Sequence, residues 1–213
     1  MRTIVPIAGA LALLAAATPA AGNALIPPFG HPATDPGQTV ETQVMGDFNG
    51  DGHGDLAYIV RGEDQRFLRV VTSMAGEFDL DTHPPQMLSL DPYPLADGTL
   101  TLRKNVLLLE DLTGGTTAVA STHRFRWDPK LGAMRLIGLD ATLYSRTFAH
   151  DGSEASWNVL TGDLVTRTLK LGTGPGDAAY TKTREKRVKR PSKPLRLEQS
   201  PGGDELLGWP GAQ

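Results

Sequence analysis

The sequence predicts a mainly β protein built from antiparallel sheets, arranged as a sandwich or as an open barrel. Three observations lead to this prediction. From Val40 to Lys170 the chain consists of short apolar or alternating runs separated by Gly, Pro and Asp. No window in this region repeats at helical spacing with caps at both ends. The chain contains no cysteine, so the sheets must be held by their core alone or by the core and a metal ion.

Residues 1–24 are expected to form a signal peptide. A short basic start is followed by the apolar run Ile4–Ala17, which is too short to span a bilayer. The small residues that follow suit cleavage after Ala24, with Gly22 as a close alternative. An uncleaved anchor is disfavoured because the run is rich in Ala and lacks flanking basic residues. The protein is therefore predicted to be periplasmic or secreted, to come from a bacterium, and to have no transmembrane segment after cleavage.

Residues 25–40 carry four prolines and are predicted to be an extended lead-in. A β domain is then expected over residues 41–171. Its seven candidate strands are 55–62, 66–74, 99–110, 116–127, 134–145, 154–162 and 163–171. Alternation places two sets of residues on common strand faces: Val119, Phe125 and Trp127, with Ser121 and His123 between them, and Ile137, Leu139, Ala141 and Leu143.

Residues 172–213 are predicted to be a basic, flexible C-terminal tail. A Gly-rich stretch is followed by 181–196, which holds eight basic residues and one glutamate. The run 184–189 is too charged to be buried on both sides, so it is expected to be a solvated tail or an exposed edge strand. The alternative is a contact with an anionic surface or polymer. No nucleic acid is expected, because no aromatic residues interleave with the basic ones and the signal peptide indicates export.

The stretch GDFNGDGHGD at residues 46–55 predicts a calcium site. Oxygen-bearing side chains stand at the first, third, fifth and ninth positions of a loop, which are Asp47, Asn49, Asp51 and Asp55. Calcium takes six to eight oxygen ligands at loose geometry, and a chain that winds around one ion turns alternate side chains inward. Gly52 occupies the sixth position, where the backbone must turn sharply. His53 at the seventh position is expected to contribute its backbone carbonyl.

This loop resembles the calcium loop of FG-GAP/VCBS repeats, in which a D-x-N-x-D-G-x-x-D stretch opens a strand. The resemblance implies the five metal ligands Asp47, Asn49, Asp51, His53 and Asp55. The motif occurs once here, and the chain is too short for the blades of a full propeller. The order of the later segments is similar to that of small exported bacterial proteins with a single such motif. That group has no assigned activity, so the resemblance bears on the fold and the metal but not on a reaction.

No catalytic residue is predicted. The five histidines, His31, His53, His83, His123 and His150, lack the spacing of a zinc site, and the serines lack a nucleophile elbow. His123 is expected to be a half-buried strand residue, and Trp127, Trp157 and Tyr144 are expected to belong to the core rather than to a sugar-binding face.

The leading hypothesis is a non-enzymatic binding or envelope-interaction module stabilised by one structural calcium ion. The alternative is a calcium-stabilised secreted hydrolase that acts on polysaccharide or cell-wall material. A cleft with convergent carboxylates or a histidine-based dyad would favour the hydrolase.

Overall fold

The fold was analysed in a computed structural model that describes residues 31–76, 80–174 and 179–209. The predicted signal peptide, residues 1–24, lies outside these ranges, as does the first part of the lead-in. Within the described part of the chain, no helix has the length and apolar character needed to cross a membrane. The antiparallel, mainly β prediction is confirmed, and each described sheet has free edges and does not close on itself.

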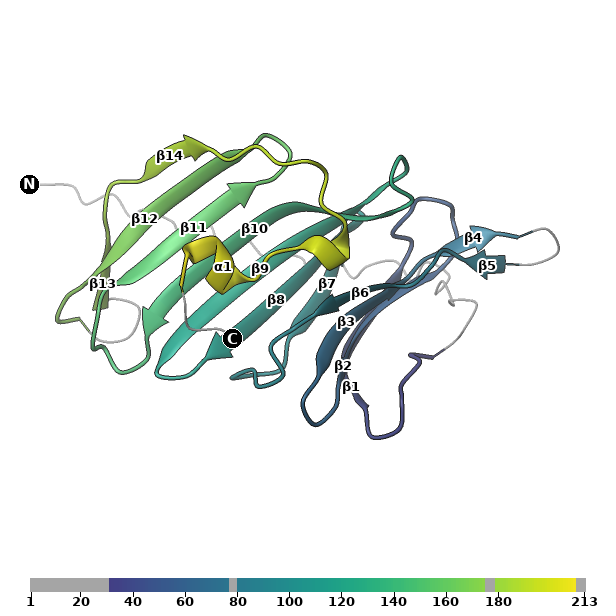
Figure 1. The fold of residues 1–213 in the computed structure, drawn as a ribbon, viewed down its shortest axis with the longest axis horizontal. Helices are drawn as coiled ribbons and strands as arrows, with labels where there is room; N and C mark the ends of the chain where they lie inside the picture. The colour runs from purple at the N-terminus through teal and green to yellow at the C-terminus, as the bar shows by residue number, and fades with distance from the viewer. Residues whose placement is uncertain (1–30, 77–79, 175–178, 210–213) are drawn as a thin grey trace, which may run out of the picture.

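The smaller sheet has four strands in the order β1-β2-β3-β6 (Figure 1). These strands are β1 (Thr39–Gly46), β2 (Asp55–Arg61), β3 (Arg66–Val71) and β6 (Gln86–Ser89). Two short strands, β4 (Ser73–Ala75) and β5 (Leu80–Thr82), pair with each other and project from it. Every described pair in this sheet is antiparallel, so the calcium-loop sequence connects two neighbouring strands, β1 and β2.

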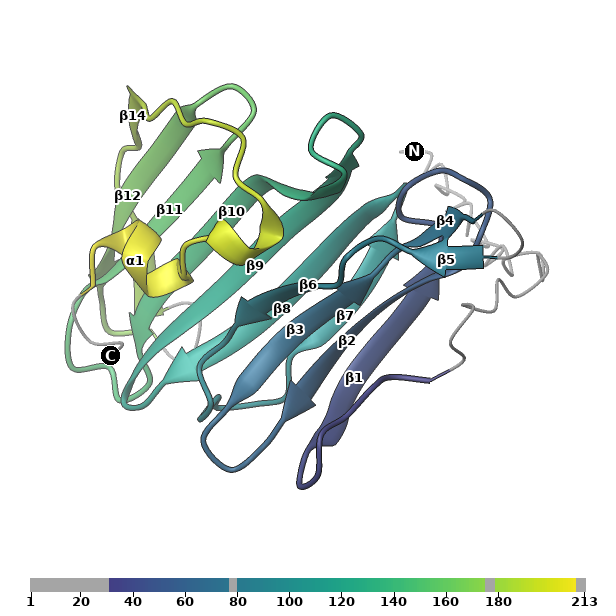
Figure 2. The ribbon, with the colours of Figure 1, turned by 45° about the vertical axis from the view of Figure 1, so that its right-hand side comes forward.

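The larger sheet runs in the order β13-β12-β11-β10-β9-β8-β7, and β14 also pairs with β12. Its strands are β7 (Thr99–Arg103), β8 (Val106–Gly114), β9 (Thr117–Asp128), β10 (Ala133–Ser145), β11 (Gly152–Asn158), β12 (Asp163–Leu171), β13 (Tyr180–Lys182) and β14 (Lys186–Lys189). Sequence neighbours pair throughout the series from β7 to β13, which gives a meander of hairpins. Figure 2 shows the smaller sheet beside one end of this larger sheet.

One hydrophobic core joins the two sheets. Ile59 and Leu68 of the smaller sheet belong to the same buried cluster as Leu109 and Phe125 of the larger sheet. All four side chains have no exposed surface. Burial of about 25 cal/mol for each Å² of apolar surface is the main stabilising contribution in such a core. A second, smaller cluster on the opposite face of the smaller sheet is built around Tyr58.

The predicted single strand over 99–110 is wrong, because these residues form the β7–β8 hairpin. Lys104 and Asn105 make its turn with φ angles of 48° and 59°. Two consecutive residues with positive φ are the mark of the tight hairpin turn that matches the twist of paired strands. Asn adopts this conformation readily, but Lys does not signal it, so the alternation of apolar residues on both sides concealed the turn.

A β-bulge in β10 overturns part of one face prediction. The register to β9 shifts between Leu136 and Gly138. Because an extra residue reverses the inward and outward alternation, Leu136 and Leu139 are both buried, whereas Ile137 is only partly buried. The prediction that Leu139, Ala141 and Leu143 share a face is confirmed, but Ile137 does not belong with them.

Residues 179–209 are part of the fold and do not form the flexible tail that was predicted. After β13 and β14 the chain forms a 3-10 helix, η2 (Leu197–Gln199), and a short helix, α1 (Gly203–Leu207), that packs on β10. Leu197 and Leu206 are buried in the main core, with exposed fractions of 0% and 7%. These apolar side chains fix the segment to the larger sheet, although the basic composition before them suggested a solvated chain.

Candidate functional site

The predicted calcium loop lies between β1 and β2 and is held in a compact turn by its own side chains. The carboxylate of Asp47 accepts hydrogen bonds from the backbone N–H groups of Gly50 (2.6 Å) and Gly52 (3.0 Å). Asn49 Oδ1 accepts from Asp51 N at 3.0 Å, and Asp51 Oδ1 accepts from His53 N at 2.8 Å. Gly50 and Gly52 have φ angles of 84° and 86°, which side chains other than glycine rarely allow.

Asp55, at the ninth position of the loop, is buried with an exposed fraction of 1%. Its Oδ2 accepts hydrogen bonds from the backbone N–H groups of Phe48 (2.6 Å) and Asn49 (3.3 Å). Its Oδ1 accepts from Ser73 N (2.7 Å) and Ser73 Oγ (2.8 Å). Burial raises the pKa of the Asp55 carboxyl, and these four hydrogen bonds oppose that shift without cancelling it. Asp55 therefore ties the loop to β4.

The donor set of the loop fits a hard cation. Within the described residues, no three His, Cys, Asp or Glu side chains converge closely enough to form a metal-binding cluster. The ligand set expected from the sequence does not depend on such a cluster, because it includes an amide oxygen from Asn49 and a backbone carbonyl from His53. Oxygen ligands of mixed type are those that calcium prefers. Asp47, Asn49 and Asp51 are not buried, so a cation can reach them.

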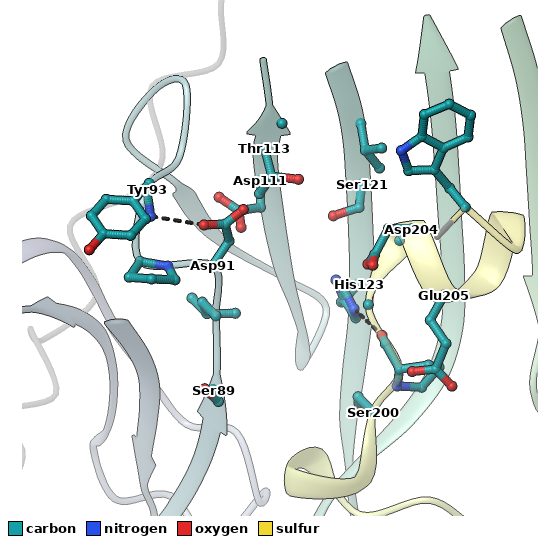
Figure 3. A pocket seen from close by; sticks show the side chains of 18 of the residues that line it. Ser89, Asp91, Tyr93, Asp111, Thr113, Ser121, His123, Ser200, Asp204 and Glu205 are labelled. Atoms are coloured by element: carbon teal, nitrogen blue, oxygen red, sulfur yellow. Dashed lines mark hydrogen bonds between the residues drawn. The ribbon is translucent and has the colours of Figure 1, made fainter. Parts of the chain in front are cut away.

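A groove of about 860 Å³ lies on the larger sheet, far along the chain from the calcium loop. Three segments form it: the connection that follows β6, the strands β8 and β9, and the C-terminal segment that leads into α1. Figure 3 shows Asp91 and Tyr93 on one wall, Asp111 and His123 on the sheet, and Asp204 and Glu205 on the opposite wall. Pockets of this size commonly bind small molecules.

The strand register explains which side chains face the groove. Asp111 of β8 stands opposite Ser121 of β9, and His123 follows two residues later on the same face. Gly203 of α1 lies directly against Ser121 of β9. A Cβ atom at position 203 would lie 2.7 Å from the Cβ of Ser121. The absence of a side chain at Gly203 thus lets α1 rest directly on the sheet and form the wall of the groove.

His123 is buried in the groove, with an exposed fraction of 4%. Its Nε2 lies 2.9 Å from the carbonyl oxygen of Pro201, and a carbonyl can only accept, so Nε2 carries the proton. Burial lowers the pKa of His123, which favours the neutral ring. In this tautomer Nδ1 holds a lone pair, and no hydrogen-bond partner satisfies it among the described residues. The predicted half-buried strand residue is therefore a buried one.

A buried ion network stands behind the groove. Arg66 of β3 is completely buried and donates to both oxygens of Asp111, at 3.0 Å from Nη1 and 2.9 Å from Nη2. Its Nε and Nη2 donate to the two oxygens of Glu41 in β1, at 2.8 Å and 2.7 Å. The two carboxylates raise the pKa of Arg66 despite its burial. This guanidinium joins the smaller sheet to the larger one and fixes the Asp111 carboxylate.

The network should make the protein sensitive to acid. Burial acts to raise the pKa of Glu41, but hydrogen bonds from Arg66 and Gly98 outweigh it, so the pKa lies below the ordinary 4.5. A carboxyl with a lowered folded-state pKa stabilises the fold above its unfolded pKa, and that stability is lost as the pH falls through the folded value. Glu41→Gln should therefore be much less stable than wild type near neutral pH, and the gap should narrow below pH 4.5.

Urea denaturation over a pH series measures this gap. Glu63→Gln is the control, because Glu63 is exposed and lies in no ion pair among the described residues. A gap for Glu41→Gln that stayed constant as the solution became more acidic would contradict the role of the ionised carboxylate.

Most of the residues that line the groove were not predicted from the sequence to belong to a site. Tyr93 and Trp209 line it and are 66% and 41% exposed. By contrast, the expectation that Trp157 belongs to the core is confirmed by its exposed fraction of 3%. Trp127 packs against the main core and lies with its ring centroid 4.8 Å from that of His83. No sequence spacing connects Tyr93 with Trp209, so only the path of the chain brings them to one groove.

The basic segment forms an exposed edge strand, β14, as one of the two sequence interpretations proposed. Part of its charge is neutralised: Lys189 lies 2.7 Å from Asp163, and Arg187 pairs with Glu185 at 2.5 Å. These pairs leave less free positive charge than the sequence suggested. They make the strand a weaker candidate for an anionic surface or polymer.

A comparison with family models finds no match, and comparisons with curated proteins and with solved structures find none either. The resemblance of residues 47–55 to an FG-GAP/VCBS calcium loop therefore stays a prediction that rests on the residues of the loop.

Proposed function

We propose that the protein is an exported binding module, periplasmic or secreted, that has no catalytic activity and is stabilised by one calcium ion. The binding role rests on one observation, the groove that β8, β9 and two distant segments form together. Loops and termini placed on a rigid sheet are where binding sites are commonly found.

The chemistry of the groove favours binding over hydrolysis. A histidine base needs a nucleophile hydrogen-bonded to its free ring nitrogen, but Nδ1 of His123 has no hydrogen-bond partner among the described residues. A carboxyl acid must be free to exchange a proton, but both oxygens of Asp111 accept hydrogen bonds from Arg66. Asp111 is therefore held in a structural contact. The alternative, a secreted hydrolase for polysaccharide or cell-wall material, would have to use the other carboxylates of the groove, Asp91, Asp204 and Glu205.

For the metal, we propose that side-chain oxygens of Asp47, Asn49 and Asp51 and the carbonyl of His53 hold the ion. The family resemblance also implies Asp55 as a ligand, but each of its oxygens already accepts two hydrogen bonds, so we propose that Asp55 shapes the loop around the site. When bound, calcium would neutralise the charge that these carboxylates gather at short range. It would thereby stabilise the turn between β1 and β2.

Calcium should raise the melting temperature by about 5 to 10 °C at a hundredfold excess over its dissociation constant, since binding to the folded state alone contributes about 2.7 kcal/mol. Thermal unfolding with calcium and with a chelator measures the shift. Asp51→Ala should abolish it, because Asp51 is an exposed loop residue proposed to bind the metal through its side chain. Asp81→Ala, at an exposed aspartate outside the loop, is the matched control. Identical wild-type melting curves with and without calcium would refute the metal proposal.

A further inference from the structure

Three carboxylates of the groove lack basic partners. Asp91, Asp204 and Glu205 line the groove and take part in no ion pair within the described ranges. No Lys or Arg is among the described residues that line it. Elsewhere the carboxylates of Asp128, Asp140, Asp151, Asp163 and Glu154 are each within 4 Å of a basic side chain. Three unpaired carboxylates thus share one concave surface that has no basic residue in its described lining.

The fourth carboxylate of the groove, Asp111, is already neutralised by Arg66 from behind. The net negative charge of the groove therefore comes from the other three carboxylates. Charges that line a concave, low-dielectric surface reinforce one another and raise the local concentration of ions of opposite sign. A positively charged ligand is favoured at this place by electrostatics alone.

A buried acceptor in the same groove supports a ligand that donates hydrogen bonds. Nδ1 of His123 is unpartnered, and its residue is more than nine-tenths buried. The hydroxyl of Ser200, which also lines the groove, has no partner among the described residues either. Figure 3 shows His123 on the floor of the groove, beside the C-terminal segment to which one ring nitrogen is hydrogen-bonded. Buried polar groups are nearly always satisfied, so an unpaired acceptor at this position indicates a missing donor.

Two exposed aromatic side chains are the third feature of the groove, after the unpaired charge and the unpaired acceptor. Tyr93 belongs to the connection after β6, and Trp209 follows α1, so they come from the two opposite walls. Large aromatic side chains are usually buried, yet these two are 66% and 41% exposed. The faces of Trp and Tyr attract ammonium groups through the ring quadrupole. Tyr93 is also fixed in place by a hydrogen bond from its hydroxyl to Asp64.

We propose that this groove binds a cationic ligand of the polyamine class, an aliphatic chain that carries two or more ammonium groups. Asp204 and Glu205 pair with one ammonium group and Asp91 with another, and the aromatic rings of Tyr93 and Trp209 cover the ligand at the two walls. An N–H group that reaches the base of the groove supplies the donor for His123. This inference rests on the proposed binding role and adds the chemistry of the ligand.

Other ligands match the groove less well. An anionic polymer would meet three unpaired carboxylates and no basic side chain. A neutral oligosaccharide suits the aromatic rings and the acceptor oxygens, but it gains nothing from the uncompensated charge. A polyamine uses the charge, the acceptors and the aromatic rings together.

Calorimetric titration of the full protein with spermidine, in the presence of saturating calcium, tests the proposal. We expect one saturable site whose affinity falls as salt is added, because ion pairing contributes to it. Asp204→Asn combined with Glu205→Gln should weaken spermidine about tenfold or more, and Trp209→Ala about fivefold. Asp81→Asn removes an exposed carboxylate elsewhere and should leave the affinity unchanged.

Three outcomes would overturn the ligand class. Equal spermidine affinity in the wild type and the Asp204→Asn, Glu205→Gln variant would show attraction without a site. Binding of hexalysine without spermidine would indicate a basic peptide. Binding of cellohexaose without spermidine, weakened by Trp209→Ala, would indicate a neutral glycan. The last two results would leave the binding role intact, whereas the calcium melting experiment tests the metal independently of any ligand.

Discussion

Replacing Arg66 by Ala should lower the free energy of unfolding by about 3–5 kcal/mol, because it leaves the buried Asp111 carboxylate without a counter-charge and Glu41 with only the partly exposed Arg61, 2.9 Å away. The side chains of Glu41 and Asp111 are only 3% and 6% exposed. Neither can recover the lost interaction from water. Each also keeps its negative charge in a region where the surrounding dielectric constant is low.

The geometry of the network makes lysine a poor replacement. Arg66 makes two parallel hydrogen bonds to each carboxylate, an arrangement that only a planar guanidinium can provide. Arg66→Lys should retain the charge but lose the forked contacts, so its stability should lie between those of the wild type and Arg66→Ala. An Arg66→Met variant combined with Glu41→Gln and Asp111→Asn should recover part of the loss, since no buried carboxylate is then left charged and Arg61 keeps Asp97 at 3.4 Å.

Urea denaturation with far-ultraviolet circular dichroism measures these differences. The matched control is Arg187→Ala, which removes the same side chain from an ion pair at an exposed position, 71% accessible. Pairs of that kind typically contribute less than about 1 kcal/mol. A similar, small loss for both alanine variants would mean that the buried network does not hold the sheets together.

The fold could be predicted from the sequence where local pattern and tertiary position agree. The predicted ranges of β9 and β12 agree closely with the strands observed. The β7–β8 turn and the bulge in β10 were missed although the sequence marks them weakly, by the polar run Arg103–Asn105 and by Gly138, because strong apolar runs flank both signals. β14 is fully exposed, so its sequence carries no burial pattern.

The two candidate sites differ in how much of them is local in sequence. All five residues of the loop lie between positions 47 and 55, so their spacing alone predicts a common site. The groove combines Asp91, Asp111, His123 and Glu205, which only the meander and the return of the C-terminal segment bring together. Arg66 was missed for a related reason. Its burial depends on partners that lie 25 and 45 residues away in the sequence.

Asp55 has a structural role in the calcium loop that does not depend on the ion. Asp55→Ala removes the acceptor for the N–H groups of Phe48 and Ser73, which lie in a buried environment. Leaving a buried donor without a partner costs about 1–3 kcal/mol for each group. We therefore expect the variant to lose about 3–5 kcal/mol of unfolding free energy even when calcium is absent. Asp55→Asn keeps the shape but turns one acceptor into a donor, so it should lose less.

The decisive comparison is with Asp51→Ala, in the presence and in the absence of calcium. Asp51 is exposed, and within the loop its carboxylate accepts only from His53 N and from the amide of Asn49. Its removal should leave the metal-free protein almost unchanged and should abolish the gain from calcium. Urea denaturation with a chelator should therefore show a large loss for Asp55→Ala and a small one for Asp51→Ala. Equal losses would mean that Asp55 is no more important to the metal-free fold than a surface residue, contrary to its burial and its four hydrogen bonds.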